Sequence, residues 1–521
     1  MTSARRPTLL LFLFALLLGL AFQGSRGLYE TTEGRYAEVG REMLESGDWW
    51  IPQLNYEPHW TKPPLTYWGI AAGIALAGPT ALGARLVNGV AFPFVVLAVT
   101  WLGTLLWDRR TGQVAGLAYA TSLFPIVAAS TISTDLLLTL WEVLTAAFYW
   151  RAVRTAEDQG ENSARATRAW VFAFWTVSGL AFLTKGPPGL LTLLAVLVFH
   201  GTGLRRGWGL PRLASPSGLI AFLVVGFGWY LDVIHRTPGL LGYLLGDEVV
   251  GRVATDQFRR NPEWYKPLFV YGLPLGLGLG GWLVHLRSLR RAHRTTAARR
   301  PLRETLTGDP IHLFLFLWLS LPLAVLSISL SRLPLYVLPF FAVLPLALAR
   351  ALVTGFSKET LRRRVTRTTA IMAILILALK VGSAVFPSRS DMSSLYATIG
   401  AASMLASSSD LSREAALRPS RPAPPLVVAV DESALHGLQF YLGGRLNWAR
   451  TAPEGSAPSL TGLISAIANE PTSAPHLFVA RETRAAAVES TLCGSVGVEC
   501  REAPPGMGWR IWIVTPEARG P

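Results

Sequence analysis

Long apolar runs separated by short polar loops occupy the first 387 of the 521 residues of this chain. A run of about 20 apolar residues crosses the hydrocarbon core of a bilayer as a helix, because a helix satisfies its own backbone hydrogen bonds. The sequence therefore predicts an α-helical polytopic membrane protein with about 11 transmembrane helices. The predicted spans are 8–24, 85–107, 112–131, 135–153, 169–184, 187–203, 217–235, 267–286, 311–329, 333–352 and 368–387.

The charge composition agrees with a membrane protein. Only 16% of the residues are charged, whereas soluble globular chains carry roughly 25%. The net charge of +15 raises the alternative of nucleic-acid binding. However, the basic residues form short clusters between apolar runs, as expected of cytoplasmic loops, and we predict no nucleic-acid partner. With the N-terminus inside, the dense basic runs all fall in cytoplasmic loops, at 108–110, 154–168, 205–212, 287–303 and 358–367.

Two apolar segments have a second interpretation. The first run follows Arg5 and Arg6 and resembles a secretory signal, but Ala21-Phe22-Gln23 is a poor cleavage site, so we interpret it as an uncleaved first span. Leu65–Ala77 is apolar enough to be a span, yet counting it would invert the charge bias of the later loops. We predict instead a helix lying at the outer membrane interface, within a first extracytoplasmic loop of residues 25–84.

The apolar runs end near residue 387, which closes the predicted membrane domain, 1–387. Residues 388–424 are rich in Ser, Ala, Arg and Pro and are predicted to form a linker. In residues 425–521, three short apolar strands alternate with helix-like stretches, which predicts a small extracytoplasmic α/β domain. Cys493 and Cys500 lie in this region and either form a disulfide or remain thiols.

The first loop carries many carboxylates and aromatic side chains between two apolar runs, which indicates chemistry or recognition. Glu33 lies where the loop enters a predicted helix over 34–44, against the membrane. Partial desolvation there would raise its pKa toward the range of a general base. The alternative is a surface ion-pair ladder formed by Glu33, Arg35, Glu38, Arg41 and Glu42.

Asp135 is the second candidate carboxylate, because it opens the apolar run of the fourth predicted span. An ionisable residue at the end of a span is costly to bury and indicates function. The alternative is that Thr134 or Asp135 caps that helix.

Several cations are predicted at the same outer face, where a lipid-linked phosphate would lie. Arg grips a phosphate with two donors and Lys acts as a point charge, although both residues also merely extend toward water at span ends. The predicted phosphate- or substrate-binding residues are Arg35, Lys62, Lys185, Arg252, Arg332 and Tyr336.

The sequence gives no support for a metal or nucleotide cofactor. His59, His235, Glu57 and Asp247-Glu248 contain metal-binding side chains, but their spacing fits no tight site, so a divalent metal is not predicted. Phosphate-binding loops, dinucleotide fingerprints and nucleophile elbows do not occur.

In the motifs that contain many of these residues, the chain resembles the bacterial relatives of the dolichyl-phosphate-mannose protein mannosyltransferases, particularly the aminoarabinose (lipid A) transferase branch. The resemblance runs from about residue 29 to 351, and its more specific motifs are TEGRYAEVGREMLESGDWWIPQLN and HWTKPPLTYW. Weaker matches are ALGARLVN, STDLLLT, LAFLTKGPPGLL and SLSRLPLYVLPFFAVLPLALARAL. The resemblance implies an inverting glycosyltransferase that uses a polyprenyl-phosphate sugar at the outer leaflet.

The resemblance also implies roles for individual residues. Asp135 matches the second acidic position of the family, and Lys62 matches its lipid-phosphate lysine. The first-loop motif usually begins Asp-Glu, but here Thr32 replaces the Asp, so Glu33, or Glu30 from the preceding turn, is the remaining candidate base.

The sequence therefore predicts sugar transfer from an undecaprenyl-phosphate carrier to lipid A, another envelope glycan or a protein. The expected location is the inner membrane, with the active site and the C-terminal domain facing the periplasm. The main alternative is a flippase or transporter of lipid-linked sugars, which should show charged residues within its spans. A receptor anchored by its spans is a third alternative.

Overall fold

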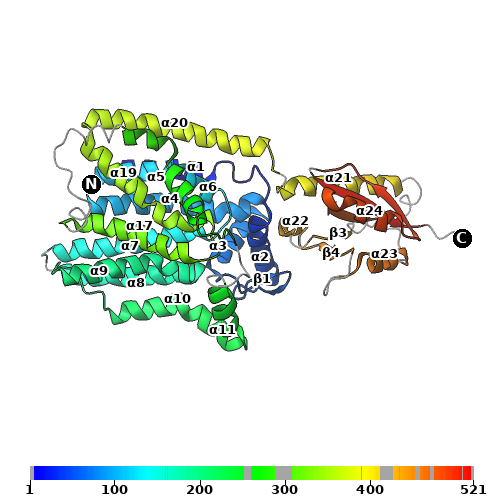
Figure 1. Cartoon of the computed structure of the whole chain (residues 1–521), viewed down its shortest axis with the longest axis horizontal. Helices are drawn as coiled ribbons and strands as arrows, with labels where there is room; N and C mark the ends of the chain where they lie inside the picture. The colour runs from blue at the N-terminus through cyan, green and yellow to red at the C-terminus, as the bar shows by residue number, and fades with distance from the viewer. Residues whose placement is uncertain are drawn as a thin grey trace.

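The structure is a computed structural model of the whole chain. It describes residues 5–517, apart from 159, 161, 252–259, 288–307, 389, 411–425, 433–434, 452–457, 470–474 and 507. A large helical domain is followed along the long axis by a small α/β domain (Figure 1). The predicted fold class, a polytopic helical protein with a small C-terminal α/β domain, is confirmed.

Eight helices of the described residues are long and apolar enough to cross a membrane, or up to 10 when each of two bent pairs counts as one span. A further apolar helix, α1 (Arg5–Leu20), lies at the N-terminus. Each of the eleven predicted spans overlaps one of these elements. The long ones are α4 (Ala81–Leu106), α7 (Asp135–Glu157), α8 (Ser163–Lys185), η1 (Pro187–Leu190) with α9 (Leu191–Arg205), α10 (Pro216–Arg236), α17 (Pro310–Ile328), η5 (Pro334–Val337) with α18 (Leu338–Phe341) and α19 (Val343–Gly355), and α20 (Lys358–Val385).

The two bent pairs break where the sequence favours an interruption. Helices α5 (Arg109–Ala120) and α6 (Leu123–Ala129) meet at 61° around Thr121 and Ser122, whose hydroxyls bond back to carbonyls of the preceding turn. Helices α13 (Lys266–Val270) and α14 (Gly272–Leu277) meet η4 (Gly280–Leu283) at 81°, beside the glycines that follow α14. Short segments α11 (Leu240–Tyr243) and η2 (Leu244–Val250) follow α10.

Polar residues start several of the long helices. The side chain of the residue before the helix accepts a hydrogen bond from a backbone amide of the first turn, which satisfies one of the free N–H groups there. In α10 and α17 a proline at the first helical position adds a fixed φ angle. The capping residues are Thr80, Asp108, Ser215, Asp309 and Ser357.

The first loop forms a compact layer at one end of the helical domain. It contains α2 (Thr32–Ser46), the strand pair β1 (Gln53–Leu54) and β2 (Glu57–Pro58), and α3 (Leu65–Ala77). Helix α3 has 13 residues, about 20 Å at 1.5 Å per residue, which is too short to cross a core of about 30 Å. This length agrees with the prediction that Leu65–Ala77 is not a span. We call this end of the helical domain the loop end.

The small domain is built around one mixed sheet in the order β4-β3-β5-β7-β6. The first three strands are parallel, while β5–β7 and β7–β6 are antiparallel. The strands are β3 (Leu426–Val430), β4 (Leu446–Ala449), β5 (His476–Arg481), β6 (Val498–Glu502) and β7 (Trp509–Pro516). Three of them, β3, β5 and β7, correspond to the strands predicted from the sequence.

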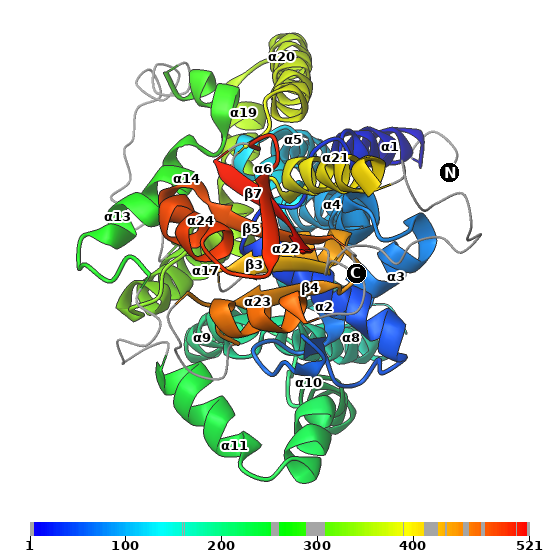
Figure 2. The same cartoon turned by 90° about the vertical axis from the view of Figure 1, so that its right-hand side faces the viewer.

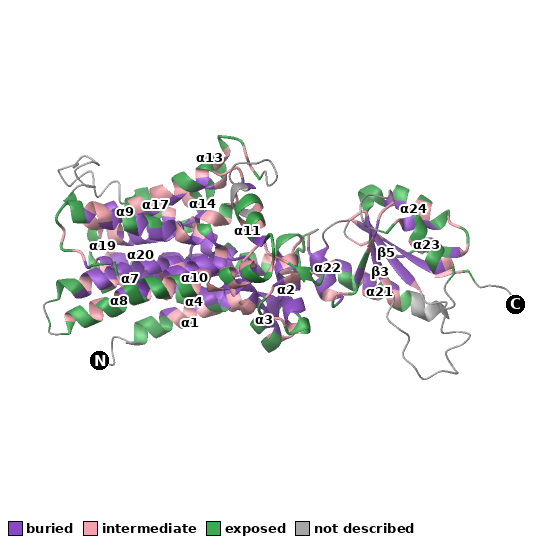
Figure 3. Cartoon of the chain, turned by 90° about the horizontal axis from the view of Figure 1, so that it is seen from below, coloured by how far each residue is buried: buried purple, intermediate pink, exposed green. Residues whose placement is uncertain are grey.

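Helices cover both faces of this sheet. Helices α21 (Met392–Asp410) and α22 (His436–Tyr441) pack on one face, and α23 (Leu460–Ala468) and α24 (Ala485–Cys493) pack on the other. The central strands β3 and β5 are almost fully buried between them, whereas the edge strands β4 and β6 also carry exposed residues (Figure 3). Although α21 lies in the segment predicted as a linker, its Leu395 and Ile399 belong to the core of the small domain.

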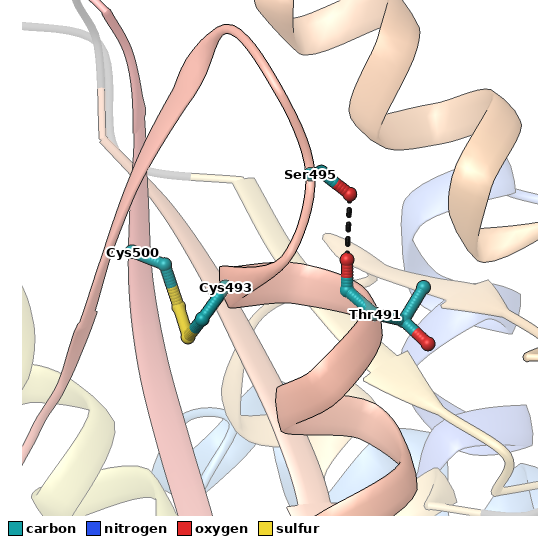
Figure 4. Close-up of a disulfide and its surroundings, with 4 residues drawn as sticks. All are labelled: Thr491, Cys493, Ser495 and Cys500. Atoms are coloured by element: carbon teal, nitrogen blue, oxygen red, sulfur yellow. Dashed lines mark hydrogen bonds between the residues drawn. A yellow bond between two sulfur atoms is a disulfide. The ribbon is translucent and has the colours of Figure 1, made fainter.

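A disulfide joins Cys493 at the end of α24 to Cys500 in β6 (Figure 4). The hydroxyl of Ser495, in the loop between them, donates to the carbonyl of Thr491 at 2.6 Å. The disulfide therefore closes a short loop between α24, on one face of the sheet, and the edge strand β6.

The small domain docks on the first loop through α22. Viewed from the end of the molecule, α22 lies over α2 (Figure 2). Phe440 inserts among buried side chains of α2 and α3, including Val39 and Ile70. A Cβ atom built on Gly34 of α2 would lie 2.3 Å from the amide nitrogen of Gly437, so only glycine allows this approach.

Candidate active site

Glu33 lies at the start of α2 and is buried under the loop end of α4. Its carboxylate accepts bonds from Arg85 at 2.8 and 3.0 Å and from Arg26 at 2.7 Å. Backbone amides of Tyr29 and Ile132 donate to it at 3.1 and 3.0 Å. The carboxylate therefore joins three segments of the chain that are distant in sequence: residues 26–33, the start of α4 and the segment before α7.

These contacts reverse the direction of the pKa shift expected for Glu33. Burial alone raises the pKa, but the charges and hydrogen bonds of Arg85 and Arg26 outweigh it and hold the pKa at about 2. The prediction of a raised pKa is wrong, because the sequence does not show that two guanidinium groups would meet this carboxylate. A carboxylate held in this way accepts a proton poorly.

Glu38, Arg41 and Glu42 belong to the same helix but do not form a surface ladder. Arg41 bonds Glu38 at 2.8 Å, and both glutamates are fully buried. Glu42 accepts the amides of Asn55 and Tyr56 and so holds the β1–β2 turn against α2. Because the loop and the small domain cover this face, the surface interpretation is wrong.

Asp135 and Lys185 form a buried ion pair at the loop end of α7 and α8. Lys185 also lies over the ring of Tyr336, with its Nζ atom 4.3 Å from the ring centroid. Thr134 makes no side-chain capping bond, so the capping alternative for this residue has no support in the structure. The structure thus brings three of the predicted site residues together from three separate helical segments.

Tyr36 and Arg35 connect this ion pair to the first loop. Tyr36 is buried in α2, where burial raises the pKa of its hydroxyl, and it interacts electrostatically with Lys185 and Asp135. The guanidinium of Arg35 lies 5.8 Å from the ring of Tyr36. Its Nε atom is buried and has no hydrogen-bond partner among the described residues. A half-buried guanidinium with an unpaired buried Nε is a group expected where an anionic ligand binds.

Lys62 and Arg35 both lie near His59. Its Nζ donates to the carbonyl of Thr61 at 2.6 Å, and Thr61 Oγ1 lies 2.6 Å from His59 Nε2. Burial, followed by the charges of Arg35 and Lys62, lowers the pKa of His59 to about 4. The imidazole is therefore neutral near pH 7, and the positive charge here belongs to Lys62 and Arg35.

Arg332 is held by backbone carbonyls, but its buried Nε atom has no hydrogen-bond partner among the described residues, and its phosphate-binding role stays a prediction. Its guanidinium donates to the carbonyls of Asn261, Glu263 and Ser327 at 2.8–2.9 Å and is buried. It therefore ties the loop before α13 to the segment before η5. The predicted residue Arg252 lies outside the described residues.

Glu30 faces the small domain. Its carboxylate accepts the amide of Gly437 in α22, and its second oxygen is buried without a hydrogen-bond partner among the described residues. Burial raises the pKa of Glu30 to about 7, although neighbouring amides and the charge of Arg481 act in the opposite direction. Glu30 thus belongs to the interface between the two domains.

Several charged residues that the structure buries were not singled out from the sequence, among them Arg85 and Glu142. Arg85, a partner of Glu33, is the first residue of a predicted span. A charged residue at the end of a span indicates function, so this position could have been found from the sequence. Glu142 is fully buried in α7, where Thr192 donates to it at 3.1 Å. Within the described part of the chain, no three His, Cys, Asp or Glu residues are grouped so as to hold a metal ion.

Comparison with known proteins finds similarity to the same family. Residues 7–235 match the family model described as dolichyl-phosphate-mannose-protein mannosyltransferase. The chain is 32% identical over 373 residues to the undecaprenyl phosphate-alpha-4-amino-4-deoxy-L-arabinose arabinosyl transferase of Pseudomonas savastanoi pv. phaseolicola, covering 69% of this chain and 63% of that one. It is also 32% identical over 361 residues to the Pseudomonas aeruginosa protein of the same name, covering 67% and 60%. The resemblance predicted from the sequence is confirmed.

The chain thus spans about three-fifths of the length of these relatives. Its fold is similar over the full length of both chains to ArnT from Cupriavidus metallidurans bound to undecaprenyl phosphate, with a TM-score of 0.71 and 22% identity. The archaeal oligosaccharyltransferase AglB from Archaeoglobus fulgidus is more distant, with a TM-score of 0.53. The chain is a multi-pass membrane protein whose fold is similar to that of ArnT.

Proposed function

We propose that this chain transfers a sugar from an undecaprenyl-phosphate carrier to an envelope acceptor such as lipid A. The names of the similar proteins support undecaprenyl phosphate-linked 4-amino-4-deoxy-L-arabinose as the donor to test first. The reaction would take place at the loop end, facing the periplasm from the inner membrane. This orientation is supported by the arginine-rich loops after α4 and α7, which lie at the opposite end.

The observation that carries the proposal is the buried Asp135–Lys185 pair against Tyr336, beside Arg35 and Lys62. A buried ion pair seldom stabilises a protein more than well-packed apolar residues would. Its presence at the end of two spans, close to further cations, is instead what recognition of a phosphate sugar requires.

The chemistry follows from these charges. The bond between the sugar C1 atom and the carrier phosphate oxygen breaks, while the acceptor oxygen forms a bond to C1 from the opposite face. Lys185, Lys62 and Arg35 would stabilise the negative charge that develops on the leaving lipid phosphate. If the acceptor is a hydroxyl group, its proton passes to Asp135; a phosphate acceptor has no proton to give, and Asp135 then only positions it.

We assign this role to Asp135 rather than to Glu33 or Glu30. Glu33 is saturated by two arginines and two amides, and Glu30 contacts α22. Arg332 would act indirectly, by holding the loop before α13, and a role for Arg252 stays a prediction.

The proposal is tested by mass spectrometry of envelope lipids and glycoproteins from a strain lacking the gene. We expect the loss of one sugar from lipid A or another envelope component, restored by the wild-type chain and by a Glu359→Gln variant, which alters an exposed residue far from the loop end. Asp135→Asn and Lys185→Met should not restore it, although both insert normally. An unchanged set of envelope molecules after deletion would contradict the proposed activity.

A further inference from the structure

A groove of about 740 Å³ opens on the membrane-facing side of the helical domain, far from the loop end. It runs along α4 and is bounded by α7, by the start of α5 and by the N-terminal turn of α1. Nothing in the proposed transfer reaction uses it. Its shape and chemistry nevertheless resemble a binding site for a single lipid.

The walls of the groove are apolar over most of its length. Phe94, Leu97 and Trp101 of α4 face Leu144 of α7. Two of the three lining threonines bond within their own helix: Thr100 Oγ1 donates to Val96 O, and Thr104 Oγ1 donates to Thr100 O, each at 2.8 Å. The walls therefore offer mainly methyl groups and rings, together with the buried indole N–H of Trp141, which has no hydrogen-bond partner among the described residues.

The ends of the groove differ in polarity. One end, near Phe94, lies in the middle of α4, while Arg109 and Gln113 of α5 line the other end. The ten residue steps from Phe94 to Thr104 rise about 15 Å along the helix, which is half of a hydrocarbon core of about 30 Å. The groove thus extends from the bilayer midplane to one surface, the depth of one leaflet.

The polar end has the charge that complements a phosphate. Arg109 is exposed there, and Arg110 follows it. Asp108, which precedes them, caps α5 and contacts Arg350 at 3.6 Å. Arg109 and Arg110 therefore carry positive charge at the polar end of the groove, and arginines at a membrane surface attract anionic lipid headgroups.

We propose that the groove binds one anionic glycerophospholipid of the leaflet opposite the active site. One acyl chain lies along α4 between Phe94 and Thr104, and the headgroup phosphate meets Arg109. This site is independent of the proposed sugar transfer, because it lies at the other end of the spans.

The test is native mass spectrometry of the purified full chain, offered phosphatidylglycerol and phosphatidylcholine with the same acyl chains. The wild-type chain should retain one phosphatidylglycerol with about fivefold preference, the contribution expected of one arginine at an anionic surface. Arg109→Gln should abolish the preference and leave total lipid retention unchanged. Leu97→Trp, which fills the groove, should abolish retention of both lipids.

Matched controls separate the site from general effects. Arg362→Gln removes an exposed arginine on the same side of the membrane, and Leu223→Trp enlarges an exposed apolar residue of α10; both should bind as the wild type does. Equal retention of the two lipids by the wild type, or an Arg109→Gln variant that keeps the preference, would overturn the proposal. Displacement of the lipid by undecaprenyl phosphate would also overturn it, because the groove would then hold the donor tail.

Discussion

At the scale of single residues, Glu33 depends on partners that the sequence does not place beside it. Arg26 is seven residues away and Arg85 is 52 residues away. Arg85 and Glu33 are each only 1% exposed, so their charges are screened by each other and scarcely by water. The position of Glu33 at the membrane was predictable from the sequence, but the sign of its pKa change was not.

Replacing Glu33 by Gln should destabilise the chain strongly. The variant leaves two buried guanidinium groups facing a neutral amide, and breaking a buried ion pair costs about 3–5 kcal/mol. The measurement is the thermal unfolding midpoint in detergent. Glu45→Gln, which alters a half-exposed partner of Arg41, serves as the control and should change the midpoint little.

The interaction of Glu33 with its arginines also makes the stability of the protein depend on pH in the acid range. The pKa of Glu33 is lowered from its ordinary value of 4.5 to about 2 in the folded chain. Its contribution to stability is therefore complete above pH 4.5 and is lost as the pH falls toward 2. If the Glu33→Gln variant and the wild type unfold at the same temperature at neutral pH, the ion pair contributes nothing to stability.

Tyr336 is expected to act through its ring. Tyr336→Phe keeps the aromatic face under Lys185 and should retain most of the transfer activity. Tyr336→Leu removes the cation–π contact, which is worth about 0.5–2 kcal/mol, and should lower kcat/KM by about 2- to 30-fold. The comparison of kcat/KM for the two variants is the measurement; equal losses would assign the effect to the hydroxyl group.

At the scale of elements, the contact between α2 and α22 depends on Gly34. Gly34→Ala places a methyl group against the backbone of Gly437, which cannot move aside as a flexible side chain would. We expect the small domain to separate from the first loop, seen as faster hydrogen exchange across α22. Gly382→Ala in α20 meets open space and should leave the exchange unchanged.

The elements themselves were largely predictable, whereas their contacts were not. Apolar length and loop charge predicted every span, because a bilayer imposes both rules on the sequence directly. Strands β4 and β6 were missed, since LNWA and VECRE carry polar residues at the sheet edges and lack a continuous apolar run. The docking of α22 left no local signal, because it needs a glycine and a phenylalanine about 400 residues apart.

At the scale of the whole molecule, Glu30 makes the docking of the small domain on the helical domain depend on pH. The interface raises its pKa from 4.5 to about 7, so the docked form favours the protonated carboxyl group. Docking should therefore be strongest below pH 4.5 and weaken as the pH rises through 7. Hydrogen exchange of α22 between pH 4.5 and 8, corrected for the intrinsic pH dependence, measures this change.

Glu30→Gln provides the control, since its amide oxygen can still accept the hydrogen bond from Gly437 while the ionisable group is removed. In this variant the corrected exchange should no longer change with pH. His436 also lies in the interface, and burial lowers its pKa, so a pH dependence that persists in Glu30→Gln would assign the coupling to His436 instead.

The link between Cys493 and Cys500 has a consequence for the biogenesis of the chain. Such a bond persists only where thiols are oxidised, and reducing compartments remove it. With the small domain in the proposed periplasmic location, its completion would depend on export to a compartment with an oxidant supply. Cells grown under reducing stress should accumulate chains with two free thiols whose final strands are open to proteolysis.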